Sequence, residues 1–149
     1  MSNLSRKTED YLEAILDESL LKGYARNAGV SRRIGVSPPS VVEMFNKLDG
    51  LGFVTYRKYE GVVLTEEGRV IAQNIRDRHD TLKRLFCIIN VPEDVADEDA
   101  CLMEHELKSE TVAQIRLLIE YLEAQAGSEG IRHDFRLFCA EKKADPEKD

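Results

Sequence analysis

Long apolar runs are missing from this sequence, and none approaches the about 20 residues that a bilayer-spanning helix needs. The first residues, Met1 to Lys7, also lack the apolar core of a secretory signal peptide. Cysteine is scarce, because only Cys87, Cys101 and Cys139 occur, an odd and widely spaced set that argues against a disulfide framework. These absences argue against a membrane protein and a small disulfide-stabilised secreted domain, and we expect a cytoplasmic protein.

Positive charge is also in short supply, since 21 Lys and Arg stand against 28 Asp and Glu and the net charge is -7. The deficit is uneven, because basic residues outnumber acidic ones by six to three between Tyr24 and Leu64. A basic segment in an acidic chain is expected when one surface contacts phosphate and another binds cations. With 42% hydrophobic and 33% charged residues, the composition fits a folded, largely helical chain and argues against disorder.

The first part of the chain predicts three helices and a hairpin. Apolar residues at helical spacing predict a helix over residues 4–21, and a short helical stretch begins at Asn27. Ser37, followed by proline, is typical of the N-cap of a further helix. Residues 53–64 are rich in β-branched and aromatic side chains and predict two short strands. This order is that of a winged helix-turn-helix.

The helix after Ser37 is the expected recognition helix. Val41, Phe45 and Leu48 share its inner face, which directs its polar residues outward, toward the bases and phosphates of a major groove. A solvated charged surface and a protein-protein module are the alternatives to DNA binding. The residues expected at double-stranded operator DNA are Arg26, Arg32, Ser37, Pro39, Ser40, Glu43, Met44 and Lys47, with Arg57 and Lys58 at the hairpin tip.

The rest of the chain predicts helices only. Thr65 caps one that reaches about Ile89, a second runs from Pro92 to Leu107, and a third over residues 109–126 is assigned to dimerisation. An amphipathic piece follows at residues 131–138. The fold class is therefore mainly α, with an N-terminal winged helix-turn-helix over residues 1–65, a helical metal-binding and dimerisation domain over 66–144, and a frayed tail over 145–149.

Three potential metal ligands stand close together in the predicted second helix of that domain. Cys101, Glu104 and His105 are spaced i, i+3 and i+4, which puts a thiol, a carboxylate and an imidazole on one helical face. Asp10 and Glu13 in the first helix are also three apart. The remaining candidate ligand is His79, on the helix after the hairpin.

Each of the separate candidates also has a structural interpretation. Asp10 and Glu13 are also explained as solvated acids, and His79 as a hydrogen-bonded core histidine. Cys87 and Cys139 are interpreted as structural thiols, because most buried thiols behave as small hydrophobes.

Several motifs resemble the diphtheria toxin repressor family of metal-dependent transcriptional regulators, and within it the short manganese transport regulator branch. The resemblance runs nearly end to end, and the most specific motif is Ala100 to Leu107. The other motifs are Glu9 to Ile15, Val36 to Val42, Asn46 to Leu48, Gly61 to Gly68 and the pair Arg78 and His79.

The resemblance implies a homodimeric repressor whose metal lies at the junction of its DNA-binding and dimerisation domains. It assigns Asp10, Glu13, His79, Glu104 and His105 to the manganese-type ligand set. Cys101 instead stands where the iron branch has cysteine, and Asp10 stands where that branch has methionine. The implied metal ligands are thus a hybrid set: Asp10, Glu13, His79, Cys101, Glu104 and His105.

Other features of the iron branch are absent. Asp97 occupies the position of an ancillary histidine, Lys83 occupies that of an ancillary glutamate, and we expect no C-terminal SH3-like domain. Carboxylates suit Mn²⁺, whereas a thiolate favours Fe²⁺, Co²⁺ or Zn²⁺. We therefore expect Fe²⁺ or Mn²⁺ as the cofactor, with Co²⁺, Ni²⁺, Zn²⁺ or Cd²⁺ as surrogates.

Besides a metal-dependent repressor of metal uptake or homeostasis, two other functions are compatible with parts of the sequence. A winged-helix regulator that senses a small organic effector would use the predicted DNA-binding domain, and the polar cluster would then be merely structural. A metal-dependent hydrolase is a further alternative, because carboxylates and histidines can activate water. No phosphate loop or nucleophile constellation supports catalysis, so we expect no enzyme.

Overall fold

The computed structural model describes residues 4–20 and 22–144, without the side chains of residues 126 and 128. The chain divides into two compact units, Met1–Arg76 and Asp77–Asp149. The predicted end of the first helix at residue 21 and the predicted tail over 145–149 lie outside the described residues. The domain limits inferred from the sequence stay a prediction.

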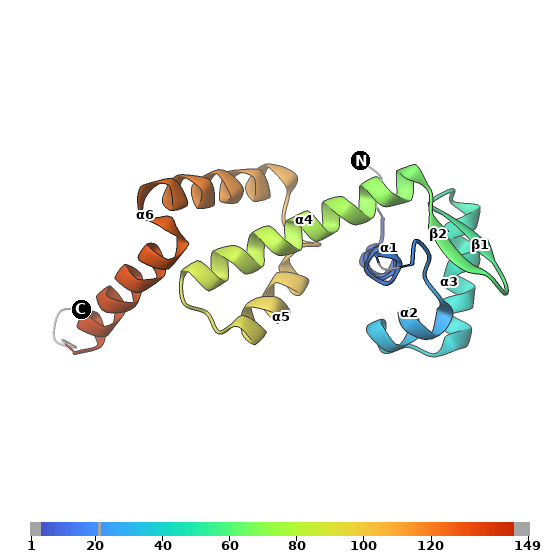
Figure 1. Cartoon of the computed structure of the whole chain (residues 1–149), viewed down its shortest axis with the longest axis horizontal. Coiled ribbons are helices and arrows are strands. Elements are labelled where there is room, and N and C mark those ends of the chain that lie inside the picture. Colours follow the sequence, from blue (N-terminus) through green and yellow to red (C-terminus); the bar gives the residue numbers. More distant parts are fainter. Residues whose placement is uncertain (1–3, 21, 145–149) are drawn as a thin grey trace. The chain divides into compact units, whose positions relative to one another are not determined.

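The first unit holds three helices, a two-stranded antiparallel sheet and the beginning of a fourth helix (Figure 1). This order confirms the predicted winged helix-turn-helix within a mainly α fold. The elements are α1 (Arg6–Ser19), α2 (Asn27–Ile34), α3 (Pro38–Gly50), β1 (Val54–Arg57), β2 (Gly61–Leu64) and α4 (Glu66–Ile88).

Side-chain hydroxyl groups cap the N-termini of two helices of this unit. Ser5 is the N-cap of α1 and accepts a hydrogen bond from the Thr8 amide at 3.3 Å. Thr65 precedes α4 and accepts one from the Gly68 amide at 3.2 Å, as predicted. Ser37 also stands at the N-cap of α3, but it does not cap through its side chain, which pairs with the Ser40 hydroxyl at 2.9 Å.

One hydrophobic core holds α1, α2, α3 and the sheet together. Val41, Phe45 and Leu48 of α3 are fully buried, which confirms the predicted inner face of this helix. Tyr11 and Ile15 of α1 are also fully buried in the same cluster. Burial on this face leaves the opposite side of α3 in solvent.

The hairpin is tied to the segment before α2. Its register runs from Val54 opposite Leu64 to Arg57 opposite Gly61. Ala25 then pairs with Val62 through two backbone hydrogen bonds of 2.8 and 2.9 Å. This additional backbone bridge fixes β2 beside the segment that leads into α2.

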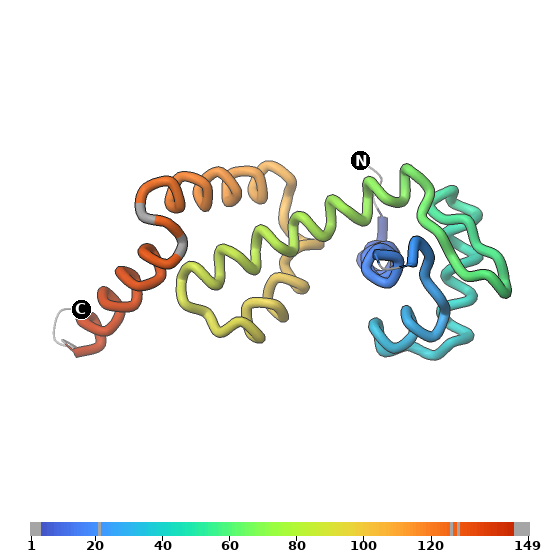
Figure 2. Tube along the Cα trace, in the orientation of Figure 1, coloured from blue at the N-terminus to red at the C-terminus, as the bar shows by residue number. Residues whose placement is uncertain are grey.

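The second unit contains the rest of α4, α5 (Glu93–Met103) and α6 (Ser109–Ala144). One predicted boundary was wrong. α5 ends at Met103 and not at Leu107, because residues 104–106 form a turn. α6 consists of two helical pieces that meet at Gly127, where the backbone is non-helical (φ 68°, ψ 157°), and the direction changes between its orange and red segments in Figure 2. This confirms the predicted end of the helix over residues 109–126 and the separate amphipathic piece that follows it.

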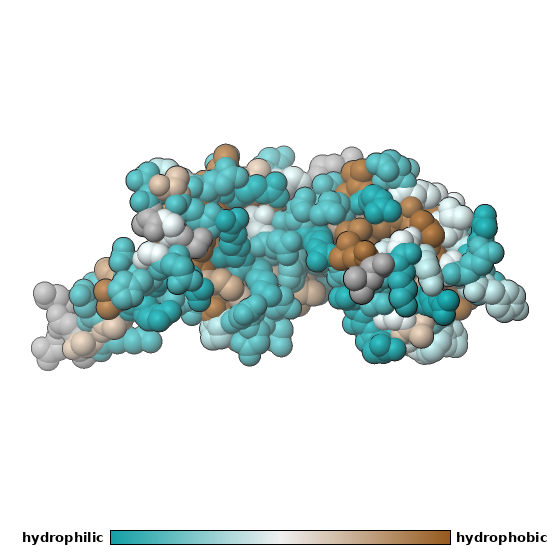
Figure 3. All heavy atoms as spheres, in the orientation of Figure 1, coloured by the Kyte–Doolittle hydropathy of each residue, from teal (hydrophilic) through white to brown (hydrophobic). Residues whose placement is uncertain are grey.

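α6 displays several apolar side chains to solvent in the described chain. Leu117, Leu118 and Tyr121 are 55%, 48% and 62% exposed. On the face drawn in Figure 3, brown groups over α6 interrupt a largely hydrophilic surface. None of the helices in the described residues has the length and apolar character required to cross a membrane.

Candidate metal centre and nucleic-acid interface

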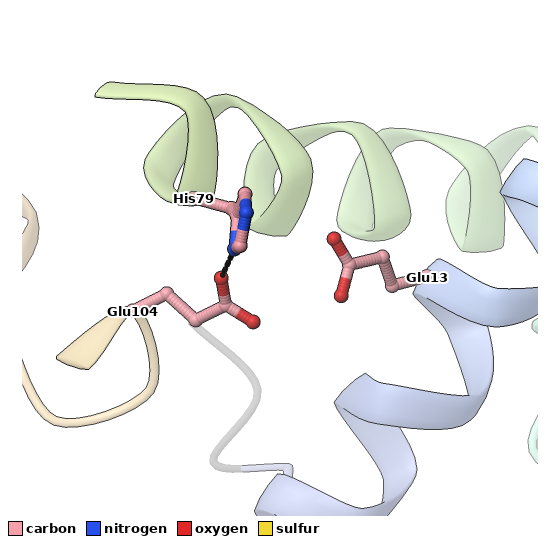
Figure 4. A group of neighbouring side chains, drawn as sticks. All are labelled: Glu13, His79 and Glu104. Carbon is pink, nitrogen blue, oxygen red and sulfur yellow. Dashed lines mark hydrogen bonds and ion pairs between the residues drawn. The ribbon is translucent and has the colours of Figure 1, made fainter. Parts of the chain in front are cut away.

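Glu104 is the central residue of the candidate metal centre. It directly follows the last residue of α5, and its side chain is fully buried. Its Oε2 atom lies 2.8 Å from Nδ1 of His79 on α4, a hydrogen bond that Figure 4 shows. Its Oε1 atom lies 3.1 Å from Nε2 of His105, whose side chain is 2% exposed. One buried carboxylate therefore faces two imidazoles.

The electrostatics of this group favour the ionised carboxylate. Burial by itself raises the pKa of Glu104, because a carboxylate loses solvation inside a protein. The contacts with His105 and His79 outweigh burial and hold the pKa of Glu104 below its ordinary value. Glu104 is thus an anionic oxygen donor close to two nitrogen donors, a combination that binds divalent transition metals.

The turn that carries Glu104 and His105 is anchored to α4. Arg78, the residue before His79, donates a side-chain hydrogen bond to the backbone carbonyl of Leu107. The amide of Glu104 donates to the carbonyl of Ala100 at 2.9 Å and completes the last turn of α5. These contacts position His79, Glu104 and His105 near one another.

A second group of charges lies on the other side of His79. Asp97 Oδ1, on α5, is 3.3 Å from His79 Nε2 and 2.8 Å from Lys83 Nζ on α4. The hydrogen bond from Lys83 lowers the pKa of Asp97 and raises that of Lys83 itself. In the sequence, Asp97 and Lys83 stood out only because they differ from the residues of the iron branch at these positions. The sequence did not show that the two side chains pair with each other. Their opposite charges were the available signal.

The structure places the other predicted ligands as follows. Asp10 and Glu13 are half-buried on α1, in the first unit. Glu13 is the third side chain drawn in Figure 4. Cys101 is on α5 with an exposed side chain, in contrast to the buried Glu104 three residues later. A ligand role for Asp10, Glu13 and Cys101 stays a prediction.

The candidate nucleic-acid interface is formed by α3, the start of α2 and the hairpin. Met44 is only 7% exposed and packs in the core, so it does not share the outer face of α3 that was expected for it. Ser40 is partly exposed. The other predicted DNA contacts are all exposed: Arg26, Arg32, Ser37, Pro39, Glu43, Lys47, Arg57 and Lys58.

Two aromatic residues accompany the basic side chains of this interface. The Arg26 guanidinium lies 5.5 Å from the centre of the Tyr24 ring, and Lys58 Nζ lies 5.6 Å from that of Tyr59. Tyr59, at the hairpin tip, is 90% exposed. A cavity of about 680 Å³ opens between the hairpin, α3 and the start of α2, and Arg26 and Lys58 are among its lining residues. Tyr59 was not among the residues predicted for this interface, although the sequence shows an aromatic residue next to Lys58 at the hairpin tip.

Comparison with known proteins matches both units to one family. Residues 3–62 match the N-terminal DNA binding domain of iron dependent repressors, and residues 65–129 match the metal binding and dimerisation domain of the same family. The chain therefore belongs to the diphtheria toxin repressor family of metal-dependent transcriptional regulators. This confirms the family resemblance found in the motifs, and manganese regulators are among the relatives that the chain matches.

Individual relatives agree with this placement. The transcriptional regulator MntR of Salmonella typhimurium is 38% identical over 104 residues, which cover 70% of this chain and 66% of that protein. The manganese regulator SloR has a solved structure with 28% identity and a TM-score of 0.66, over 76% of this chain and 54% of that one. The solved structure of IdeR from T. acidophilum has 29% identity and a TM-score of 0.65, over 77% of this chain and 54% of that one. The chain thus spans slightly less than two thirds of MntR and about half of the two solved chains.

Proposed function

We propose that this protein is a repressor that binds palindromic operator DNA as a homodimer when Fe²⁺ or Mn²⁺ is bound, and so controls metal uptake or homeostasis in the cytoplasm. The observation that carries the proposal is the buried Glu104 carboxylate, with His79 at 2.8 Å and His105 at 3.1 Å. These three residues belong to the part of the chain that matches a metal binding domain. We propose no catalytic role for the cluster, and a turnover assay would test this.

The donor set fits a divalent transition metal. Burying a carboxylate is unfavourable unless it is paired, and Glu104 is paired with imidazoles, the commonest metal ligands of proteins. In our proposal His79, Glu104 and His105 hold the ion, and Asp10, Glu13 and Cys101 complete its ligands. When bound, the divalent cation supplies the positive charge that lets several carboxylates ligate together.

The ligands proposed from α1 give metal binding a means to act on DNA. Asp10 and Glu13 belong to the helix that packs on α3 through the shared core. Ligation by these carboxylates favours the state of the dimer in which two recognition helices meet half-sites one helical turn apart, about 34 Å. Couplings of this kind are typically about 1 to 3 kcal/mol, a 5- to 150-fold change in affinity.

The test is DNA binding with and without metal in matched variants. Operator affinity is measured by fluorescence anisotropy at one stated salt concentration, with Mn²⁺, with Fe²⁺ under anaerobic conditions, and with chelator. We expect metal to strengthen wild-type binding by about 5- to 150-fold. Glu104→Gln and His105→Ala should abolish this gain while circular dichroism shows a folded protein.

Glu106→Gln is the matched control, because Glu106 is an exposed acid two residues from Glu104. It should keep the full metal response. Equal DNA affinity with metal and with chelator in the wild-type protein would refute the metal-sensor proposal.

The cavity beside the hairpin favours a second candidate, a winged-helix regulator that senses a small organic effector. Its volume of about 680 Å³ lies within the range of small-molecule sites. Equilibrium dialysis separates the two candidate functions. The metal sensor should take up Mn²⁺ or Fe²⁺, whereas a protein that takes up neither ion would favour the effector-sensing regulator.

A further inference from the structure

Asp97 connects two side chains of α4 that stand one helical turn apart. Its Oδ1 atom lies 3.3 Å from Nε2 of His79 and 2.8 Å from Nζ of Lys83. Residues four apart on a helix share a face, so α4 presents both groups to the same side of α5. Asp97 therefore occupies the point at which the two side chains converge.

The two ring nitrogens of His79 face different carboxylates. Nδ1 is 2.8 Å from Glu104 and Nε2 is 3.3 Å from Asp97. A carboxylate only accepts hydrogen bonds, so once a metal occupies the Glu104 side of the ring, Asp97 keeps the hydrogen on Nε2. Metal-ligating histidines usually donate their other N–H to a carboxylate or carbonyl in this way, which fixes the ring orientation.

Lys83 holds Asp97 in the position that this role requires. The Asp97 side chain is 54% exposed, so without a partner it would sample several rotamers. Lys83 Nζ fixes it at 2.8 Å and also reaches Glu93 Oε1 at 3.5 Å. Its ammonium group also places a positive charge on the Nε2 side of His79, which repels a cation from that side.

We propose that Asp97 is a positioning residue of the metal centre: it orients His79 through Nε2, so that Nδ1, on the Glu104 side, is the ligand atom. Lys83 keeps Asp97 in place and closes the Nε2 side to a second ion. This inference rests on the proposed function, because it takes His79 to be a metal ligand.

The test compares Asp97→Ala, Asp97→Asn and Lys83→Met with the wild-type chain. Mn²⁺ affinity and the number of ions per protomer are measured by competition with a chelating dye. Removing an outer partner of a ligating histidine typically weakens metal binding about 10- to 100-fold, and we expect this loss in Asp97→Ala. Asp97→Asn should lose less, because its amide oxygen still accepts from Nε2. Asp99→Ala, which removes an exposed acid from the same helix, should bind Mn²⁺ like the wild type.

A second readout separates positioning from general stability. Nitrogen-15 shifts of the His79 ring in the Zn²⁺-loaded protein should show metal on Nδ1 and hydrogen on Nε2 in the wild type. In Asp97→Ala the ring should lose this single assignment, while the thermal midpoint of the metal-free protein changes little. If Asp97→Ala does not fold, the same shifts and Mn²⁺ affinity in Asp97→Asn decide the question.

The outcomes distinguish the two proposals. If the wild type binds no Mn²⁺, the proposed function fails. If it binds Mn²⁺ and Asp97→Ala binds equally tightly, or if Zn²⁺ is found on Nε2, the positioning role is overturned and the sensor proposal stands.

Discussion

Arg33 and Asp17 form an ion pair between α2 and α1, with Nη1 3.0 Å from Oδ2. Arg33 also contacts Glu18 at 3.5 Å, and Asp17 forms a second ion pair with Arg76 of α4. The adjacent Arg32 is exposed on α2. The two neighbouring arginines are thus placed for different tasks, because Arg33 joins helices and Arg32 projects from the surface proposed to meet DNA.

Arg32→Ala should weaken DNA binding about equally for all sequences. A phosphate contact releases counterions, so its loss reduces the slope of log affinity against log salt by about 1. Arg33→Ala should leave this slope unchanged and lower the free energy of unfolding by less than about 1 kcal/mol, because Arg33 is 47% exposed. Anisotropy titrations at several salt concentrations, with urea unfolding of both variants, check the contrast. An unchanged slope in Arg32→Ala would remove this residue from the interface.

Glu104 should make the metal-free protein less stable in acid. The pKa of Glu104 is lowered in the folded state, because its histidine contacts outweigh burial, which raises it. The ionised carboxylate therefore contributes stability above its ordinary pKa of 4.5, and this contribution is lost as the pH falls through the lower folded pKa. In urea unfolding with chelator between pH 6 and 3, the stability of the wild type relative to Glu104→Gln should fall below about pH 4.5. A difference that grows in acid would contradict this assignment.

Cys101→Glu should shift the metal preference toward Mn²⁺. A thiolate favours Fe²⁺, Co²⁺ and Zn²⁺, whereas a carboxylate suits Mn²⁺. The ratio of Mn²⁺ to Co²⁺ affinity, measured by dye competition, should rise in Cys101→Glu. Cys101→Ser, which removes the thiolate without adding a carboxylate, should bind Co²⁺ more weakly. An unaltered ranking of metals in both variants would exclude Cys101 as a ligand. That outcome would agree with the exposed position of its side chain.

Gly68→Ala should destabilise the first unit. A Cβ atom at this position in the first turns of α4 would lie 1.9 Å from the Phe53 carbonyl oxygen, so backbone must shift. Overpacking of this kind lowers the free energy of unfolding by about 1 to 3 kcal/mol, and more where backbone is displaced. Gly50→Ala is the control, because a Cβ there meets no atom within 4 Å and alanine is the better helix former. Equal urea midpoints for the two variants would contradict the close approach of α4 to Phe53.

The order of elements could be predicted because their signals are local. The spacing of Val41, Phe45 and Leu48 predicts the buried face of α3, and the capping residue Thr65 marks the start of α4. The end of α5 was predicted wrongly, and a contact between residues distant in the sequence lies at this point. The hydrogen bond from Arg78 to Leu107 joins residues 29 apart, and helical periodicity contains no record of it.

The candidate site divides in the same way. Glu104 and His105 were found because their spacing from Cys101 is visible in the sequence, and His79 because it belongs to a motif. The pairing of Asp97 with Lys83 depends on how helices pack, so composition and periodicity did not show it. Met44 was misplaced although its spacing of three residues from Val41 and four from Leu48 puts it on the buried face of α3. The interruption at Gly127 could be predicted because glycine with positive φ is typical of helix termini.

The end of α5 at Met103 places the backbone itself beside Glu104. The aligned peptide dipoles of a helix leave a partial negative charge equivalent to about half an electron at its C-terminal end, where the Met103 carbonyl also accepts hydrogen bonds from the Glu106 and Leu107 amides. This charge comes from main-chain atoms, so no side-chain substitution abolishes it. A protein stripped of both His105 and the Glu104 carboxylate would therefore keep a weak, poorly selective attraction for cations at the tip of α5, a residual affinity that belongs to the fold.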